Sequence, residues 1–170
     1  MSIFIQPPGI LVDAAIWREY LRLCFSKRVS LDQNGGRHRY ARTMVNLPDP
    51  ARRSVPIALA RLFVAIHAQL SGETLPNKGW TVRYKNGDHL DLRIENLAVV
   101  PARGHRNSFH ACWTVKARWK IAEAGGDPKA ILAEKRRTFR ATHKAGIKRD
   151  PQPPLPPSPR PRKKTRRGKP

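Results

Sequence analysis

The chain has 170 residues, with 34 Lys or Arg against 12 Asp or Glu and a formal net charge of +22 at pH 7. Its length fits one domain with appendages. Because self-repulsion destabilises a compact fold, this charge points to a polyanionic partner, most commonly nucleic acid; a solvated basic surface is the alternative. No apolar run approaches the ~20 residues that span a bilayer, so the composition excludes a membrane-spanning protein.

The positive charge is concentrated in the second part of the chain. Residues 1–100 contain 14 basic and 8 acidic side chains, whereas residues 101–170 contain 20 basic and 4 acidic side chains. We therefore expect the main electrostatic contact with a polyanion to come from the C-terminal part.

The two cysteines and the N-terminus favour a reducing compartment. Cys24 and Cys112 cannot form a four-cysteine zinc site, and neither has CxxC spacing. We interpret both as buried thiols. The first residues lack a basic region and contain Pro7, Pro8 and Gly9, so we expect no signal peptide and no secretion.

The first half of the chain predicts two helices separated by short strands. Residues 12–26 have the apolar spacing of a helix that Asp13 caps. Residues 32–49 contain an Asn-Gly-Gly turn and predict a hairpin or short strands. Residues 54–70 are apolar on nearly every face and predict the central buried helix, with Ser54 as N-cap and Pro56 in the first turn.

The stretch WTVRYKNGDHLDLRIENLAVVP, residues 80–101, carries the most specific pattern. Residues 80–84 are aromatic and β-branched, as is typical of a strand. KNGD then predicts a tight turn. Asp91 is expected to cap a helix through residues 93–100 that ends at Pro101.

Two more helices and a tail complete the chain. Residues 107–124 predict a helix that Gly125 and Gly126 end. Asp127-Pro128 starts another helix, to about residue 143, with a basic face that suits phosphates, although a solvated helix is the alternative. Residues 151–170 are Pro-rich and basic with one large apolar side chain, so we expect a disordered tail.

The central stretch resembles the HNH endonucleases of the homing and phage type over about residues 35–105. Val55 to Phe63 resembles the family segment V-H-R-L-V-A-x-x-F, with Pro56 in place of His. The second half of the family motif, V-D-H-x-N-G-D, D-N-R and x-E-N-L, is matched by Val82, Asn86, Gly87, Asp88, Asp91, Arg93, Glu95, Asn96 and Leu97. The resemblance also favours a cytoplasmic protein, or one associated with a nucleoid or a phage.

The resemblance implies a divalent cation held between two strands and a helix. A carboxylate before a strand His and an Asn or His on the helix hold the cation, and the His activates water. In this chain Arg83 stands at the Asp position, Tyr84 at the catalytic His and Leu92 at the Asn of D-N-R. A guanidinium repels a cation, and a phenol titrates near ~10. These substitutions indicate loss of the nuclease chemistry with the frame retained.

A rearranged site is the alternative. His89 and Asn96 would be the catalytic residues, with Asp88, Asp91 and Asn96 as ligands of Mg²⁺ or another divalent cation. In the competing interpretation, Asp88 stabilises the turn, Asp91 caps a helix and His89 is a solvated loop residue. If the site is degenerate, no cofactor is expected.

The sequence thus predicts an α+β fold with a small ββα-metal core, flanking helices and a disordered basic tail. The expected segments are an N-terminal helical segment at 1–34, the HNH-like core at 35–105, a basic helical extension at 106–149 and the tail at 150–170. The predicted function is nucleic-acid binding, with DNA favoured over RNA and no membrane partner. The alternatives are an active endonuclease and a basic component of a larger nucleoprotein or virion particle. The predicted nucleic-acid contacts are Arg37, Arg39, Arg42, Arg83, Lys85, Arg93, Arg136, Arg137, Arg140, Lys163, Lys164, Arg166 and Arg167.

Overall fold

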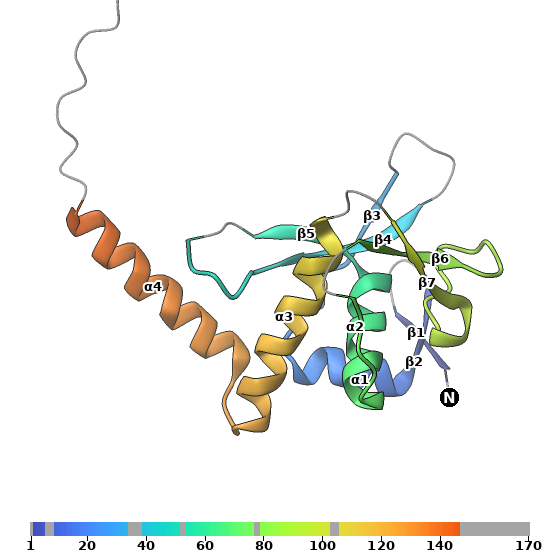
Figure 1. The fold of residues 1–170 in the computed structure, drawn as a ribbon, viewed down its shortest axis with the longest axis horizontal. Coiled ribbons are helices and arrows are strands. Elements are labelled where there is room, and N and C mark those ends of the chain that lie inside the picture. Colours follow the sequence, from blue (N-terminus) through green and yellow to red (C-terminus); the bar gives the residue numbers. More distant parts are fainter. Residues whose placement is uncertain are drawn as a thin grey trace, which may run out of the picture.

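Helices and small antiparallel sheets alternate along the chain, which confirms the α+β class (Figure 1). The structure is a computed structural model that describes residues 2–5, 9–33, 39–51, 54–76, 79–102 and 106–146. The expected tail and the Asn-Gly-Gly turn lie outside the described residues. No helix in the described ranges is long and apolar enough to cross a bilayer.

The strands form three separate sheets, each antiparallel. The first sheet pairs β1 (Ser2–Ile5) with β2 (Ile10–Asp13). The second has the order β3 (Ser30–Asp32), β4 (Tyr40–Val45) and β5 (Val55–Ala58), which confirms strands around the expected hairpin. The third is the hairpin of β6 (Trp80–Tyr84) and β7 (Leu97–Pro101).

The helices surround one buried element. They are α1 (Ala14–Arg22), α2 (Leu59–Ser71), α3 (Arg106–Glu123) and α4 (Pro128–Gly146), with a short 3₁₀ helix η1 (Ile94–Asn96) inside the β6–β7 hairpin. The α2 helix is central, because Leu59, Leu62, Phe63 and Ile66 on it are all fully buried. Residues of α1, β2, β4, β6 and α3 pack with it in a single core cluster.

Residues 55–58 are a strand, so the predicted start of the central helix was wrong. Val55 pairs with Val45 and Pro56 with Met44, which makes β5 an edge strand of its sheet. Edge strands tolerate proline because one side of the strand makes no ladder bonds. Ser54 does not cap a helix, since its hydroxyl donates to Asn46 Oδ1 at 2.5 Å.

The helix predicted over residues 93–100 was also wrong. After η1 the chain returns as β7, with Leu97 opposite Tyr84 and Pro101 opposite Trp80. The β-branched pair Val99 and Val100 fits a strand better than a helix. The segment written ENL therefore closes a hairpin.

The helices α1, α3 and α4 lie where the sequence placed them, within a few residues. Asp13 precedes α1 but makes no capping bond; its Oδ2 instead accepts the backbone N–H of Ile94 at 2.8 Å. Asp127 does act at the start of α4, because its Oδ1 accepts the N–H of Lys129 at 2.8 Å. Figure 1 shows α4 extending away from the rest of the protein.

Candidate functional site

The connection between β6 and η1 is a tight turn built by side chains that bond to nearby backbone. Gly87 has a φ of 76°, a left-handed conformation that glycine adopts without a steric penalty. Asn86 Oδ1 accepts the N–H of Asp88 at 2.8 Å, and Asp88 Oδ1 accepts the N–H of Leu90 at 2.9 Å. These are the local turn bonds that Asn and Asp favour.

The N-terminal strand β2 fixes this connection from the side. The N–H of Leu11 donates to the carbonyl of Leu90 at 3.0 Å, and the N–H of Leu92 donates to the carbonyl of Leu11 at 2.8 Å. Asp13 adds its bond to Ile94. A segment about 80 residues away in sequence thereby holds residues 90–94 in place, which no local sequence pattern had indicated.

Asn96 uses its whole side chain to close the hairpin. Its Oδ1 accepts the N–H of Asn86 at 2.9 Å, and its Nδ2 donates to the carbonyls of Asp91 at 2.8 Å and Asp88 at 3.4 Å. The residue is 5% exposed. These bonds support a structural role for Asn96.

Asp91 is likewise occupied by neighbouring donors. Its carboxylate accepts from Arg93 Nε at 2.9 Å and Arg93 Nη2 at 2.8 Å, and also from Asn86 Nδ2 at 3.0 Å. The guanidinium of Arg93 lowers the pKa of Asp91, so this carboxylate stays ionised. Its bond to the N–H of Arg93 replaces the helix cap that the sequence suggested.

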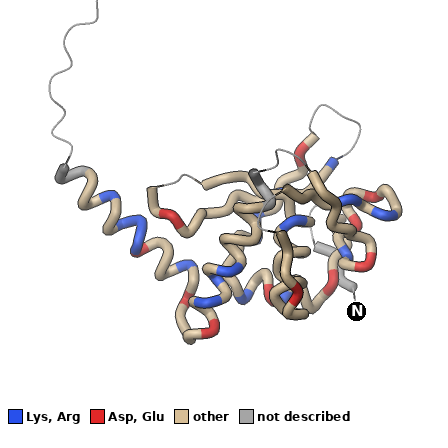
Figure 2. The backbone as a smooth tube through the Cα atoms, in the orientation of Figure 1, with Lys and Arg blue, Asp and Glu red and all other residues tan. Residues whose placement is uncertain are grey.

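The predicted nucleic-acid contacts fall into two groups on different parts of the protein. Arg83, Lys85 and Arg93 lie on the β6–η1 hairpin, with Arg39 and Arg42 in or just before β4. Arg136, Arg137 and Arg140 lie on α4 (Figure 2). Arg37, Lys163, Lys164, Arg166 and Arg167 lie outside the described residues.

Several of these cations already have partners inside the protein. Arg42 pairs with Asp32 at 2.5 Å, Arg93 pairs with Asp91 and Glu95, and Arg136 donates to Asn46 and Leu47. Arg137 pairs with Glu134 at 3.1 Å, with both side chains exposed. Arg83 and Arg140 are exposed, and within the described part neither makes an ion pair.

Residues 64–107 match the family model described as HNH endonuclease. This segment is similar to the HNH endonuclease family. It covers most of α2, the β6–β7 hairpin with its connection, and the start of α3. No match to the chain was found among curated proteins or solved structures.

The HNH segment places its helix differently from the sequence-based interpretation. Asn96 was taken for the helix residue, but it lies in η1 inside the hairpin. The helix that follows the two strands is α3.

The described side chains do not fit the divalent cation that HNH nucleases commonly use. By the sequence resemblance, Arg83 and Tyr84 would stand at the positions of the carboxylate and the imidazole. Leu92 is buried in the core. Asp91 is neutralised by Arg93. Across the described ranges, no group of three or more His, Cys, Asp or Glu side chains could hold a metal ion.

Tyr84, which the sequence resemblance assigns to the base position, has surroundings that are unfavourable for a base. Burial raises its pKa to about 12. Its ring stacks on His89, with centroids 4.4 Å apart and an interplanar angle of 16°. A general base works best when its pKa lies near the working pH, which Tyr84 does not approach.

One cation beside Tyr84 was missed by the sequence analysis. Arg61 on α2 is half-buried, and its Nη2 donates to Thr81 Oγ1 on β6 at 3.2 Å. Tyr84 and Tyr40 are close enough to affect its pKa. A signal was present, because Arg61 is the only Lys, Arg, Asp or Glu between residues 54 and 72.

Proposed function

We propose that the protein binds nucleic acid, DNA in preference to RNA, on an HNH frame without cleaving phosphodiester bonds. The HNH segment implies a nucleic-acid partner. The observation that carries the proposal is that Tyr84, which we place at the base position, is half-buried with its pKa raised to about 12. A phenol in that state does not take a proton from water near neutral pH.

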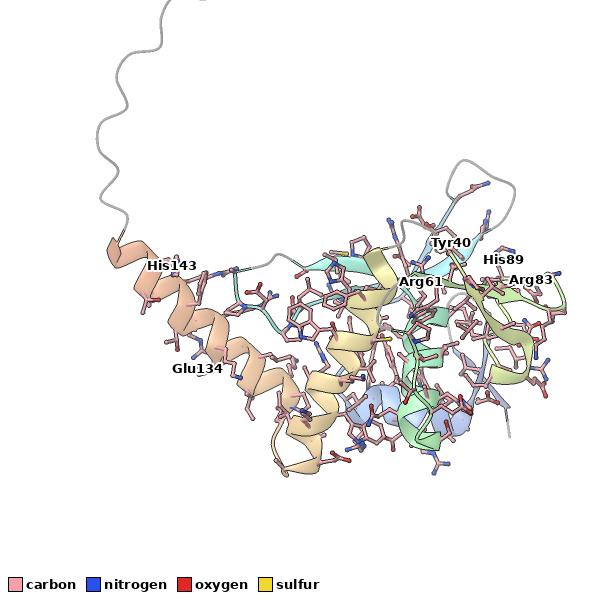
Figure 3. The ribbon with its side chains drawn as sticks, viewed as in Figure 1. Tyr40, Arg61, Arg83, His89, Glu134 and His143 are labelled. Atoms are coloured by element: carbon pink, nitrogen blue, oxygen red, sulfur yellow. The ribbon has the colours of Figure 1, made fainter. Side chains whose placement is uncertain are left out.

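The small ββα core would then serve as a binding element. Its β6–β7 hairpin is followed by α3, the order that the family uses. Arg83 lies exposed on β6 beside the position of the lost metal, and Figure 3 shows it in the same region as His89 and Arg61. In our proposal Arg83 binds a backbone phosphate, so that its guanidinium takes the place of the divalent metal ion.

The second group of cations would add affinity that does not depend on base sequence. Arg137 and Arg140 are exposed on α4, as is Lys135. Phosphate contacts of this kind release counterions, so affinity should fall steeply as salt rises. The basic tail would add to this effect.

A plasmid-nicking assay with Mg²⁺ or Mn²⁺, run beside a filter-binding salt titration, tests the proposed function. We expect salt-dependent binding and no nicking by the full chain. Nicking that is lost in His89→Ala would overturn the proposal in favour of a rearranged active site.

The role of Arg83 has its own comparison. Arg83→Ala should weaken binding and reduce the slope of log K against log salt by about 0.9, the value for one phosphate. Arg18→Ala removes an equal charge from the exposed face of α1 and is the matched control. Equal effects of the two variants would remove Arg83 from the interface.

A further inference from the structure

Arg61 is a half-buried cation without a carboxylate partner. Its one hydrogen bond joins Nη2 to the hydroxyl of Thr81, and in the described part of the chain it makes no ion pair. Burial is the largest influence on its pKa and lowers it, as expected when a charge loses solvent without gaining a counterion. Such a guanidinium gains stability from an anion that reaches it.

The carboxylate that bonds to the neighbouring Tyr40 is already neutralised. Asp32 pairs with Arg42 at 2.5 Å and accepts the hydroxyl proton of Tyr40 at 3.0 Å. Tyr40 lies close to Arg61, but its hydroxyl proton is already donated to Asp32. The charge of Arg61 therefore remains uncompensated.

The open donors beside this charge reach solvent. A guanidinium has five N–H donors, of which the Thr81 bond uses one. The hydroxyl of Tyr84 makes no hydrogen bond to any described residue. Neither residue contributes to the buried, unpartnered polar atoms of the described part, so their open donors face accessible space.

We propose that Arg61 and Tyr84 together form a binding site for one phosphate group of a nucleic-acid backbone. The guanidinium supplies the charge and two or more N–H donors in a planar arrangement that matches phosphate. The phenol of Tyr84 donates a further hydrogen bond. Its stacked neighbour His89 forms the outer wall of the site.

The location connects this site with the HNH hairpin. Arg61 lies on α2, three residues before the matched segment begins, and Tyr84 lies on β6 inside it, so the site joins the start of α2 to the HNH hairpin. Figure 3 shows Arg61, Tyr40, His89 and Arg83 gathered at one end of the protein, far from Glu134 and His143 on α4. The inference rests on the proposed function, because it assigns that function's phosphate contact to a residue pair.

The first test measures binding of the full chain to a short DNA duplex by fluorescence anisotropy over a range of salt concentrations. Arg61→Ala should bind about tenfold more weakly, as expected for loss of a charge-assisted pair of hydrogen bonds. Its salt slope should fall by about 0.9. Arg18→Ala is the matched loss of charge and should leave the slope within error of the wild type.

A second pair of variants isolates the phenol. Tyr84→Phe keeps the ring but removes the open hydroxyl, so binding should weaken several-fold. Tyr40→Phe removes a hydroxyl already bonded to Asp32 and serves as its control. Equal losses in the two variants would overturn the assignment to Tyr84.

A direct measurement covers the case in which Arg61→Ala does not fold. Inorganic phosphate is titrated into the full chain labelled with ¹⁵N-arginine, and Arg61→Lys identifies the Nε–Hε signal of Arg61. The signal should shift at millimolar phosphate; a signal that stays in place overturns the site. If the wild type binds no DNA, the proposed function fails. If it binds DNA but Arg61→Ala behaves like Arg18→Ala, only the Arg61 site fails.

Discussion

Replacing Asn96 by Ala tests whether this residue holds the hairpin or serves as a metal ligand. In the structure its amide joins Asn86, Asp88 and Asp91 across the connection. The substitution removes all of these bonds without adding a new group. We expect a clear loss in the free energy of unfolding for protein prepared without divalent metal.

The bond geometry sets the size of this loss. Two of the bonds are well formed, at 2.8 and 2.9 Å, and each contributes about 1 kcal/mol net. The third, at 3.4 Å, contributes little. The carbonyl of Asp91 then loses its partner in a buried position, which costs about 1 to 3 kcal/mol. The sum is about 3 to 5 kcal/mol.

Urea unfolding followed by circular dichroism measures this change. With a slope of about 2 kcal/mol per molar for a domain of this size, the midpoint should fall by about 2 M. Gln69→Ala removes an amide from α2 that makes no hydrogen bond to any described residue, and serves as the matched control. Both variants and the wild type are compared in chelator and with added Mg²⁺.

Two results would refute this reasoning. A midpoint for Asn96→Ala equal to that of Gln69→Ala would mean that the amide does not stabilise the hairpin. A difference that appears only with Mg²⁺ would mean that Asn96 acts through a bound cation.

Three further perturbations follow from the same structure. Because Arg93 lowers the pKa of Asp91, the Asp91 carboxylate should stabilise the fold fully above about pH 4. The difference in urea midpoint between the wild type and Asp91→Asn, measured against pH, should disappear as pH falls further. Arg118 donates to two carbonyls at the end of α1 at 2.7 and 2.8 Å and is 5% exposed, so Arg118→Ala should cost about 3 kcal/mol in thermal unfolding, and a loss under 1 kcal/mol would contradict the role. Since burial raises the pKa of Tyr84 to about 12, Tyr84→Phe should alter the tyrosinate absorbance only above about pH 11, and an earlier difference would reopen its role as a base.

Much of the helical frame was predictable from local signals. Asp127 followed by Pro128 starts α4 as expected, and the side chain of Asp127 makes the expected bond. The apolar run on α2 identified the central helix, because a helix that is apolar on all faces must be buried. The motif around Asn86, Gly87 and Asp88 likewise indicated both the turn and the family match.

The errors came where a long-range strand pairing overrides the local pattern. The run from Val55 to Leu59 is apolar throughout, so its spacing does not distinguish a strand from a helix, and pairing with β4 decides the matter. Residues 97–100 form a strand because β6 lies beside them. Asp13 stands where an N-cap is expected, but its carboxylate accepts the N–H of Ile94, because the fold brings the two residues together.

The candidate site was predictable as a motif but not as a set of contacts. The spacing identified Arg83 and Tyr84 as the departures from the family. It could not show that Asp91 and Asn96 are used by their neighbours, or that Arg61 from another element lies beside Tyr84. Those relations depend on how α2 packs on the hairpin.

Pro56 has a consequence for how copies of this protein behave at high local density. It lies in β5, the edge strand of its sheet, and presents no backbone N–H on either side. An exposed edge offers a template for strand addition by another chain, and a proline there interrupts that template. Where many copies crowd along a single polyanion that screens their mutual repulsion, this interruption would oppose sheet-to-sheet aggregation.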